Sequence, residues 1–271
     1  MKIKNILSAA VSVTAAAAVL SAAQPAVLAD TEPAVRNTIT VSNVEVTKKQ
    51  AEADGTVTIS FKLGAQSSAP KLAALGLHIS FPANENGRAL TPVVNAAGGY
   101  AQAKNGMMLT SASDSPDVLD NSVFVAAAAS SDITKSGTMF SIKVQLPEDY
   151  EVGDTYPVEI VYVDEPSAQP RFVDISGDKV SEQWTFANGI KNGSVTVSDR
   201  EYPLGDVNFD NSVDSSDAAL ILAHYARMQA SEEGSLTEEQ QANADFNYDN
   251  GIDSSDAALI LTAYAEKQAD N

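Results

Sequence analysis

The sequence contains no cysteine, one tryptophan and few aromatic residues of any kind. Without cysteine, neither a disulfide framework nor a thiol nucleophile is available. Basic residues are also scarce, because 17 Lys and Arg stand against 36 Asp and Glu, for a formal net charge of −19. Such an acidic surface repels phosphate groups, so nucleic acid is not an expected partner.

Catalytic residues are equally hard to find. The two histidines, His78 and His224, are far apart in the sequence and have no plausible Ser or Cys partner, so packing or surface roles are expected for both. No glycine loop that could cradle a phosphate is present. Six acidic residues cluster in expected loops, where a solvated role is the default: Glu148, Asp149, Glu151, Asp154, Asp164 and Glu165. Their number leaves a carboxylate pair for glycoside hydrolysis open, but the sequence as a whole predicts a protein that is not an enzyme.

Long apolar runs are absent except at the N-terminus. Lys2 and Lys4 precede an apolar stretch over 6–20 and small residues that end at Ala29, which predicts a secretory signal peptide over 1–29. A membrane span is less favoured, because the run is short and rich in Ala and Ser. With no second apolar run and no C-terminal anchor, we expect an exported, soluble chain. Its formal charge is −21, since the removed segment holds two lysines and no acid.

One stretch of the chain occurs twice. Residues 206–222 read DVNFDNSVDSSDAALIL, and residues 245–261 read DFNYDNGIDSSDAALIL. The few positions that differ keep their character, such as Val213 in the first copy and Ile252 in the second. A repeat of this kind indicates one small structural unit used twice.

The spacing of oxygen-bearing side chains predicts that each copy binds one calcium ion. Oxygen ligands stand at loop positions 1, 3, 5, 9 and 12, with a backbone carbonyl at position 7. The expected ligands are Asp206, Asn208, Asp210, Ser212, Asp214 and Asp217, and then Asp245, Asn247, Asp249, Gly251, Asp253 and Asp256. Hard oxygen donors without His or Cys suit calcium rather than zinc or copper. Position 6 needs a left-handed backbone, and Asn211 and Asn250 tolerate it. The alternative, an acidic solvated loop, is disfavoured by two matching copies.

Each loop is followed by a predicted helix, but no helix is expected before the first loop, where Pro203 and Gly205 stand. Ser215 or Ser216 would cap the first helix. Its apolar stripe would consist of Ala218, Ala219, Ile221, Leu222 and Tyr225, and the second copy repeats this pattern from Ser254. A loop plus one helix, duplicated over about seventy residues, resembles the dockerin module of cellulosomal proteins.

This resemblance implies a domain that docks onto a cohesin module of another chain through the helix starts. The implied contact residues are Ser215, Ser216, Leu222, Ala223, Ser254, Ser255, Leu261 and Thr262. Because the two copies nearly match, two docking orientations are expected. The alternative is that both serine pairs are only helix caps. The sequence also departs from the family, since the basic residues common further along the helix are replaced by Leu222 and Ala223 and by Leu261 and Thr262.

From 37 to 198 the sequence instead shows short alternating runs separated by turn signals. They cover 39–46, 56–63, 75–81, 90–95, 108–113, 122–128, 138–146, 158–163 and 193–197. This predicts a mainly β fold, a nine-stranded jelly-roll-type β-sandwich. The order of the pieces, above all ITKSGTMFSIKV at 133–144 and NGSVTV at 192–197, is similar to a cohesin. That resemblance implies a dockerin-binding face on the third, fifth, sixth and eighth strands, with Gly76, His78, Val125 and Ala127 as contact residues. Whether the alanine run 126–129 is core or interface stays open.

The sequence therefore predicts a signal peptide over 1–29, a cohesin-like sandwich over 30–199 and an all-α dockerin over 200–271. The resemblances imply a secreted, non-catalytic adaptor scaffoldin, attached to a cell surface only through its scaffoldin partner. It would receive dockerin-bearing enzymes or structural proteins at one end and bind a scaffoldin cohesin at the other, in an assembly for plant polysaccharide degradation. A competing hypothesis is a dockerin-borne carbohydrate-binding protein, although exposed aromatics are sparse and Trp184 is flanked only by Phe186. A dockerin-bearing enzyme lacks a supporting motif.

Overall fold

A computed structural model describes residues 37–64, 71–104, 106–114, 119–133, 136–163, 171–173 and 188–269. Strands account for the part up to Ser198, and longer helices follow from Ser215 on. Within these ranges, no helix has the length and apolar character needed to span a bilayer. The expected signal peptide and the pair Trp184 and Phe186 lie outside the described residues.

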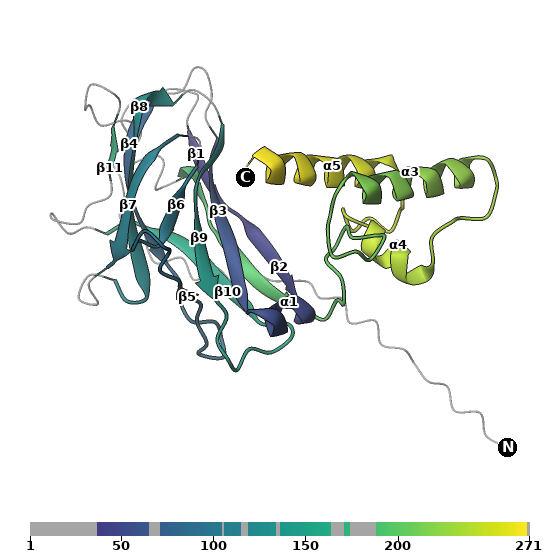
Figure 1. Cartoon of the computed structure of the whole chain (residues 1–271), viewed down its shortest axis with the longest axis horizontal. Helices are drawn as coiled ribbons and strands as arrows, with labels where there is room; N and C mark the ends of the chain where they lie inside the picture. Colours follow the sequence, from purple (N-terminus) through teal and green to yellow (C-terminus); the bar gives the residue numbers. More distant parts are fainter. Residues whose placement is uncertain are drawn as a thin grey trace. The chain divides into compact units, whose positions relative to one another are not determined.

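Two sheets packed face to face form the β-sandwich (Figure 1). The first has the order β12-β1-β3-β9-β5, with β6 also paired to β9, and the second has the order β2-β13-β10-β4-β8-β7, with β11 also paired to β4. The elements are β1 (Thr38–Val41), β2 (Asn43–Thr47), α1 (Lys48–Ala53), β3 (Thr56–Gly64), β4 (Leu72–Ser80), β5 (Thr91–Pro92), β6 (Ala101–Ala103), β7 (Met108–Ser113), β8 (Ser122–Ile133), β9 (Gly137–Gln145), β10 (Thr155–Val161), β11 (Arg171–Val173), β12 (Ile190–Lys191) and β13 (Gly193–Ser198). The predicted mainly β sandwich is confirmed.

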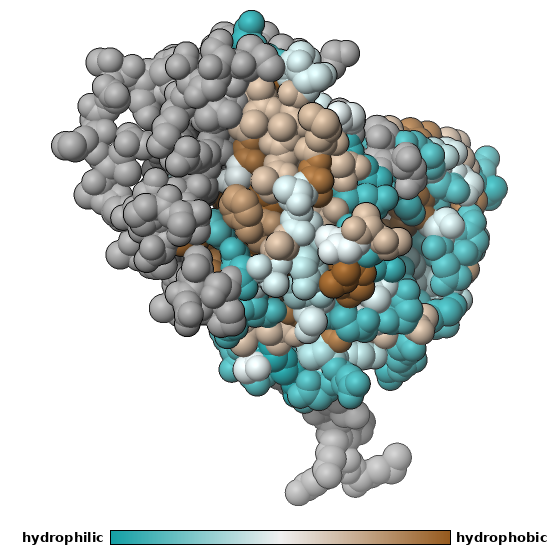
Figure 2. All heavy atoms as spheres, turned by 60° about the vertical axis from the view of Figure 1, so that its left-hand side comes forward, coloured by the Kyte–Doolittle hydropathy of each residue, from teal (hydrophilic) through white to brown (hydrophobic). Residues whose placement is uncertain are grey.

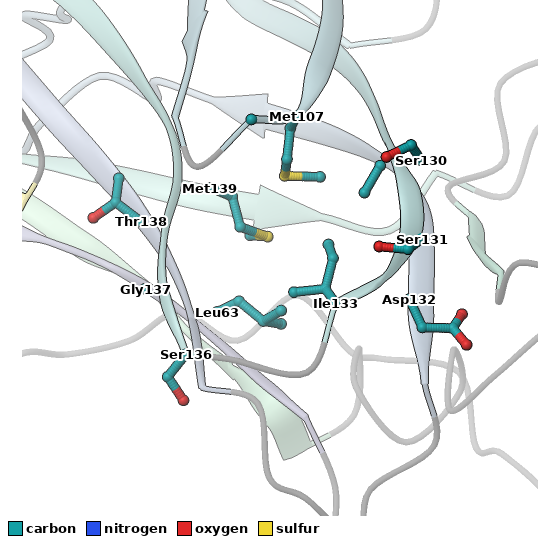
Figure 3. A pocket seen from close by; sticks show the side chains of 12 residues that line it. Leu63, Met107, Ser130, Ser131, Asp132, Ile133, Ser136, Gly137, Thr138 and Met139 are labelled. Atoms are coloured by element: carbon teal, nitrogen blue, oxygen red, sulfur yellow. The ribbon is translucent and has the colours of Figure 1, made fainter.

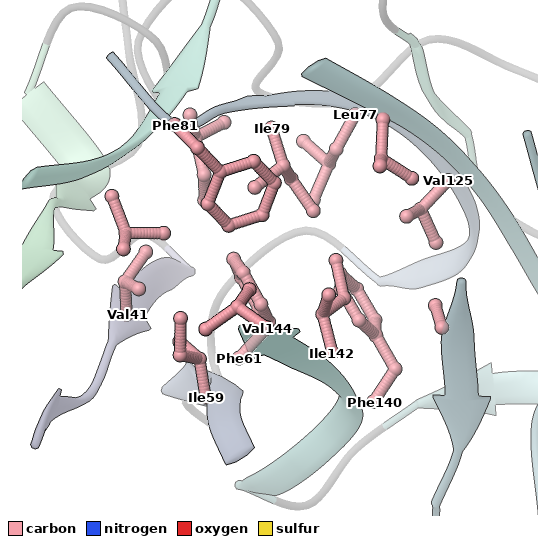
Figure 4. Close-up of a cluster of buried hydrophobic side chains, with 14 of the residues drawn as sticks. Val41, Ile59, Phe61, Leu77, Ile79, Phe81, Val125, Phe140, Ile142 and Val144 are labelled. Carbon is pink, nitrogen blue, oxygen red and sulfur yellow. The ribbon is translucent and has the colours of Figure 1, made fainter. Parts of the chain in front are cut away.

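Alternation along the strands sends every second side chain into one core between the sheets. Figure 4 shows Leu77 and Ile79 of β4 facing the side chains of β3 and β9 across this core. Phe61 and Phe140 stack with their ring centroids 4.6 Å apart. These rings and their aliphatic neighbours are fully buried, so the core supplies the main stabilisation of a domain that contains no disulfide.

The predicted strand boundaries differ from the structure where the chain changes sheet. The run 39–46 is two strands, β1 and β2, which belong to different sheets and meet at Ser42. Gly193 lies so close to the Ser42 carbonyl that no Cβ would fit between them. Helix α1 was not predicted, although Thr47 and Gln50 form a capping box that marks its start. Of the run 90–95 only β5 is strand, although the Val93 N–H still donates to the Lys143 carbonyl of β9 at 2.8 Å.

The C-terminal part consists of α3 (Ser215–Gln229), α4 (Glu238–Ala244) and α5 (Ser254–Ala269). Helices α3 and α5 pack side by side (Figure 1). Their shared core is small: Val207, Ala218, Ile221, Leu236, Ala244, Ala257 and Ile260, with Val213 and Ile252 packed against it. Val213 and Ile252, at position 8 of the two repeated loops, therefore turn inward.

One acidic residue expected to be solvated is in fact buried. The Asp154 carboxylate accepts hydrogen bonds from Arg88 Nη1 at 2.8 Å, from the Tyr156 hydroxyl at 2.9 Å and from the Glu151 N–H at 2.9 Å. Burial alone raises the pKa of Asp154, but the hydrogen bonds from Glu151, Tyr156 and Arg88 outweigh it and lower the pKa to about 2. Arg88 also binds the exposed carboxylate of Asp149. The cluster fixes the loop before β10.

This cluster predicts how the sandwich responds to acid. The pKa of Asp154 is about 2 in the fold and about 3.9 when unfolded, so the ionised carboxylate stabilises the fold by about 2 kcal/mol above pH 4 and loses that contribution as the pH falls toward 2. Asp154→Asn should lower stability near neutral pH and remove this part of the acid dependence. Urea unfolding at a series of pH values, followed by the fluorescence of the single Trp184, measures both. Asp149→Asn is the control and should leave the profile unchanged; equal acid profiles for wild type and Asp154→Asn would contradict the prediction.

Candidate functional site

The first repeated loop is closed by two buried aspartates. Asp206 accepts from the Asp210 N–H at 3.1 Å through Oδ1 and from the Asn211 N–H at 2.8 Å through Oδ2. Asp217 accepts from Val207 and Asn208 N–H through Oδ1 at 2.8 and 3.1 Å, and from the Asp214 N–H through Oδ2 at 2.9 Å. The first and last carboxylates of the predicted ligand set therefore hold both ends of the loop around one centre.

The second loop repeats this arrangement bond for bond. Asp245 accepts from the N–H groups of Asp249 and Asn250 at 3.0 and 3.1 Å. Asp256 accepts from Phe246, Asn247 and Asp253 at 2.8, 3.2 and 3.1 Å. In both copies the position 7 residue, Ser212 or Gly251, donates its N–H to the position 5 carboxylate. The structure thus brings together the residues that the sequence pattern singled out.

The repeated loops turn tightly because several of their residues have positive φ angles. Asn211 and Asn250 have φ of 69° and 64°, so the left-handed backbone predicted for position 6 is confirmed. The aromatic residues at position 4, Phe209 and Tyr248, are also left-handed, with φ of 63° and 61°. This second feature was not predicted, because bulky residues seldom adopt it and only the loop as a whole imposes it.

The donor set fits a calcium ion. Asp206, Asp217 and Asp256 are fully buried. Burial raises the pKa of Asp206, the Asn211 N–H opposes it, and the nearby charge of Asp217 raises it again, with a net upward direction. Carboxylates buried beside each other need a compensating cation. In the described part of the chain, no three His, Asp or Glu side chains could hold a metal by themselves. The amide and backbone oxygens of the same loops are ligands that calcium accepts beside carboxylates.

The helix caps differ from the prediction. The N-cap of α3 is Asp214, whose carboxylate accepts from the Ser216 N–H at 2.7 Å, and Asp253 accepts in the same way from Ser255 at 2.6 Å. Hydrogen bonds from the serine hydroxyls and N–H groups lower the pKa of both aspartates. A carboxylate accepts these bonds better than a hydroxyl does, so the serines are the first helical residues instead of caps. Their side chains remain exposed to solvent.

The two helices expose one apolar side. Leu222 and Leu261 are 43 and 42 % exposed. All eight residues predicted to contact a cohesin are exposed: Ser215, Ser216, Leu222, Ala223, Ser254, Ser255, Leu261 and Thr262. The predicted inward stripe is wrong at Ala219 and Leu222, because Ala218, Ile221 and His224 already fill the inward side. Helix α4, directly before the second loop, was not predicted, although Thr237 and Gln240 form its capping box.

The second candidate surface is the outer side of the β10-β4-β8-β7 sheet. In β8, Val125 and Ala127 belong to the core, so their predicted role as contact residues is wrong. Strand register puts Phe124 opposite His78 and Ala126 opposite Gly76, which makes Phe124, Ala126 and Ala128 the outward residues of β8. The alanine run is therefore core at Ala127 and surface at its two even-numbered neighbours.

Gly76 and His78 lie on the outer side as predicted, but both are buried. His78 is 1 % exposed, since its Nδ1 lies 2.9 Å from Oδ1 of Asp114 and its ring packs against Phe124 with centroids 4.8 Å apart. Ser122 donates to the same carboxylate at 2.8 Å. This polar group closes one end of the face, so His78 is not available as a contact residue in this structure.

The open part of the face lies over β7 and β8. Register places Met108, Thr110 and Ala112 of β7 beside Ala128, Ala126 and Phe124, and all three β7 residues are exposed. Figure 2 brings this side forward and shows apolar residues gathered beside a hydrophilic surround. The outward residues of β7 and β8 named here are uncharged, and most of their side chains are short.

Comparison with known proteins identifies both modules by class. Residues 204–263 match the dockerin type I domain, which confirms the predicted dockerin. The sandwich has the fold of cohesins. It matches the type III cohesin module of the cell-surface anchoring scaffoldin ScaE of Ruminococcus flavefaciens, with 28 % identity, a TM-score of 0.50, and coverage of 61 % of this chain and 89 % of that one. It also matches the sixth cohesin of scaffoldin B of Acetivibrio cellulolyticus, with 13 % identity, a TM-score of 0.42 and coverage of 60 and 100 %. Among curated proteins none matches the chain.

Cohesins and dockerins are non-catalytic interaction modules, and dockerin type I domains in general bind calcium. The predicted resemblances, of the sandwich to a cohesin and of the C-terminal part to a dockerin, are therefore confirmed. Among the described residues, every structured element belongs to one of these two modules.

Proposed function

We propose that this chain is a non-catalytic adaptor scaffoldin of a cellulosome-type assembly for plant polysaccharide degradation. One observation carries this proposal: a cohesin fold and a dockerin domain occur in the same chain. The cohesin-like sandwich, 30–199, receives a dockerin-bearing enzyme or structural protein, and the dockerin, 200–271, binds a cohesin of another scaffoldin. The solved structures similar to the sandwich include cohesins in complex with dockerins, which supports this pairing.

Two calcium ions organise the dockerin end. The ligands in the first loop are Asp206, Asn208, Asp210, Ser212, Asp214 and Asp217, and in the second Asp245, Asn247, Asp249, Gly251, Asp253 and Asp256. The ions neutralise the buried carboxylates and hold the starts of α3 and α5 in place. The signal peptide pattern over 1–29 supports export, after which the scaffoldin partner attaches the adaptor to a cell surface.

Calcium removal should unfold the helices and spare the sandwich. Eight loop carboxylates repel one another without cations, and the small helical core cannot offset that repulsion together with the chain entropy. We expect a chelator to abolish most of the far-ultraviolet circular dichroism signal of the helices, and added calcium to restore it. The β-sheet contribution to the same spectra reports on the sandwich and should not change. If the helical signal and its melting temperature are the same with and without the chelator, the calcium proposal is wrong.

The adaptor function is tested at the sandwich end with a charge on the open face. Full-length chain is immobilised, and proteins captured from the secreted fraction of the source organism are identified by mass spectrometry. Ala126→Asp should abolish capture of dockerin-bearing proteins, because an unpaired carboxylate would be buried at the contact. Val94→Asp is the matched control, since Val94 is 54 % exposed and follows β5 in the other sheet. If the chain is retained on insoluble polysaccharide and captures no dockerin-bearing protein, a carbohydrate-binding function replaces this one.

The dockerin end should tolerate loss of either serine pair alone. Ser215 and Ser216 in α3 match Ser254 and Ser255 in α5 in identity, exposure and hydrogen bonding, so each helix start offers nearly the same surface. Replacing one pair with arginines should leave the affinity for the partner cohesin within about threefold, and replacing both should abolish binding. Calorimetry measures the affinity, and circular dichroism checks that each variant is folded and calcium-loaded. Loss of binding through one pair alone would mean that a single face is used.

A further inference from the structure

Met108 is the most exposed large apolar side chain among the described residues of the open face of the sandwich. It is 69 % exposed and begins β7, the edge strand of its sheet. Across the sheet its register partners are Ala128 in β8 and then Ala74 in β4. A flexible thioether therefore stands above a floor of alanines. Of the residues over 74–80, 108–112 and 122–128, none is an Asp, Glu, Lys or Arg that could compete with it for a partner.

A side chain in this position has the properties of an anchor. A partner helix laid on a surface of alanines gains little from each of them, because an alanine side chain is a single methyl group. Most of the apolar burial then comes from the methionine, which is unbranched and adapts to the contour of what lies on it. Loss of such an anchor weakens an interface on the order of 30-fold.

Met108 is more exposed than the other methionines of the described residues. Met107 is 8 % and Met139 2 % exposed, and Figure 3 shows both side chains directed into a cavity of about 410 Å³ at the end of the sandwich. Met107 and Met108 are consecutive, so the alternation of the chain sends one sulfur inward and the other to solvent. Met228 of α3, 52 % exposed, is the remaining accessible thioether in the part of the chain that the structure describes.

We propose that Met108 is the anchoring residue of the cohesin-like face and a modification site at which oxidation by a peroxide abolishes docking. The thioether sulfur attacks one oxygen of hydrogen peroxide, an S–O bond forms, the O–O bond breaks, and water leaves. Sulfur is oxidised to the sulfoxide and the peroxide is reduced. This inference rests on the proposed docking function and adds to it a chemical state that controls one end of the adaptor.

The consequence for binding follows from the floor around the sulfur. A sulfoxide oxygen is a strong hydrogen-bond acceptor that gives up its water when a partner covers it. Its cross-strand neighbours Ala128 and Ala74 offer no side-chain donor to replace that water. The oxidised face therefore carries an unsatisfied polar atom at its contact point.

The first experiment maps the oxidation. The full-length chain carrying Met228→Leu, which removes the other accessible thioether, is treated with hydrogen peroxide and its peptides are followed by mass spectrometry over time. Met108 should oxidise at least tenfold faster than Met107 and Met139, in line with their exposure. Equal rates for Met108 and Met107 would overturn the inference.

The second experiment links oxidation to docking. The probe is a dockerin-bearing protein captured by the untreated full-length chain, and its affinity is measured before and after peroxide. In the Met228→Leu background we expect a loss on the order of 30-fold, reversed by methionine sulfoxide reductase. In Met228→Leu combined with Met108→Leu, peroxide should change nothing, whatever affinity that variant starts from.

The outcomes separate the two proposals. If the untreated chain captures no dockerin-bearing protein, the proposed function is wrong at this end and the inference falls with it. If it captures one and complete oxidation of Met108 leaves the affinity unaltered, the docking function stands and the inference alone is wrong.

Discussion

A strand or helix at the surface of a domain buries one side in the core and leaves the opposite side exposed. In β8 the odd-numbered residues Val123 and Val125 are fully buried, which leaves Phe124 and Ala126 on the opposite side of the sheet. In α3 the buried Ile221 is followed by the exposed Leu222. The candidate docking surfaces consist of the sides that face away from the cores. Their geometry is therefore fixed by the cores behind them, and a change in register would move every contact residue at once.

How much could be predicted from the sequence depends on how local the signal is. The calcium loops are specified within twelve residues, and even the left-handed turn at Asn211 follows from the pattern. The outward side of β8 is not specified locally, because both the odd and the even residues of VFVAAAA are apolar. Only the pairing of Ala126 with Gly76 of β4, fifty positions earlier, decides it. Predicted contact residues Val125 and Ala127 were wrong for this reason. The same ambiguity affected Ala219 and Leu222 in the helix.

The two histidines show a second limit of local reasoning. Packing or surface roles were expected for both, and His78 was also an expected contact residue. Both are buried, and their partners are distant in sequence. His78 is held by Asp114, which follows the end of β7. His224 accepts hydrogen bonds through Nδ1 from the N–H groups of Ser235 and Leu236, at 3.1 and 3.2 Å. By accepting these two N–H groups, His224 ties α3 to the segment that leads into α4. In both cases a buried imidazole satisfies polar groups that the turn of the chain would otherwise leave unpaired.

Charge is distributed so that it does not reach the docking surfaces. Many of the acids of the C-terminal part lie in the repeated loops, where Asp206, Asp217 and Asp256 are buried and Asp214 caps a helix. The exposed sides of β7, β8, α3 and α5 present Met, Ala, Thr, Leu and Ser at their centres. Uncharged surfaces gain little from electrostatic steering and cannot reject a wrong partner by like-charge repulsion. Discrimination must then come from shape. On the sandwich, the side chain that protrudes is Met108, which lies beside alanines. On the dockerin, Leu222 and Leu261 protrude beside the serine pairs. An adaptor with an uncharged surface at each end therefore depends on the fit of a few apolar side chains to keep its two partners apart.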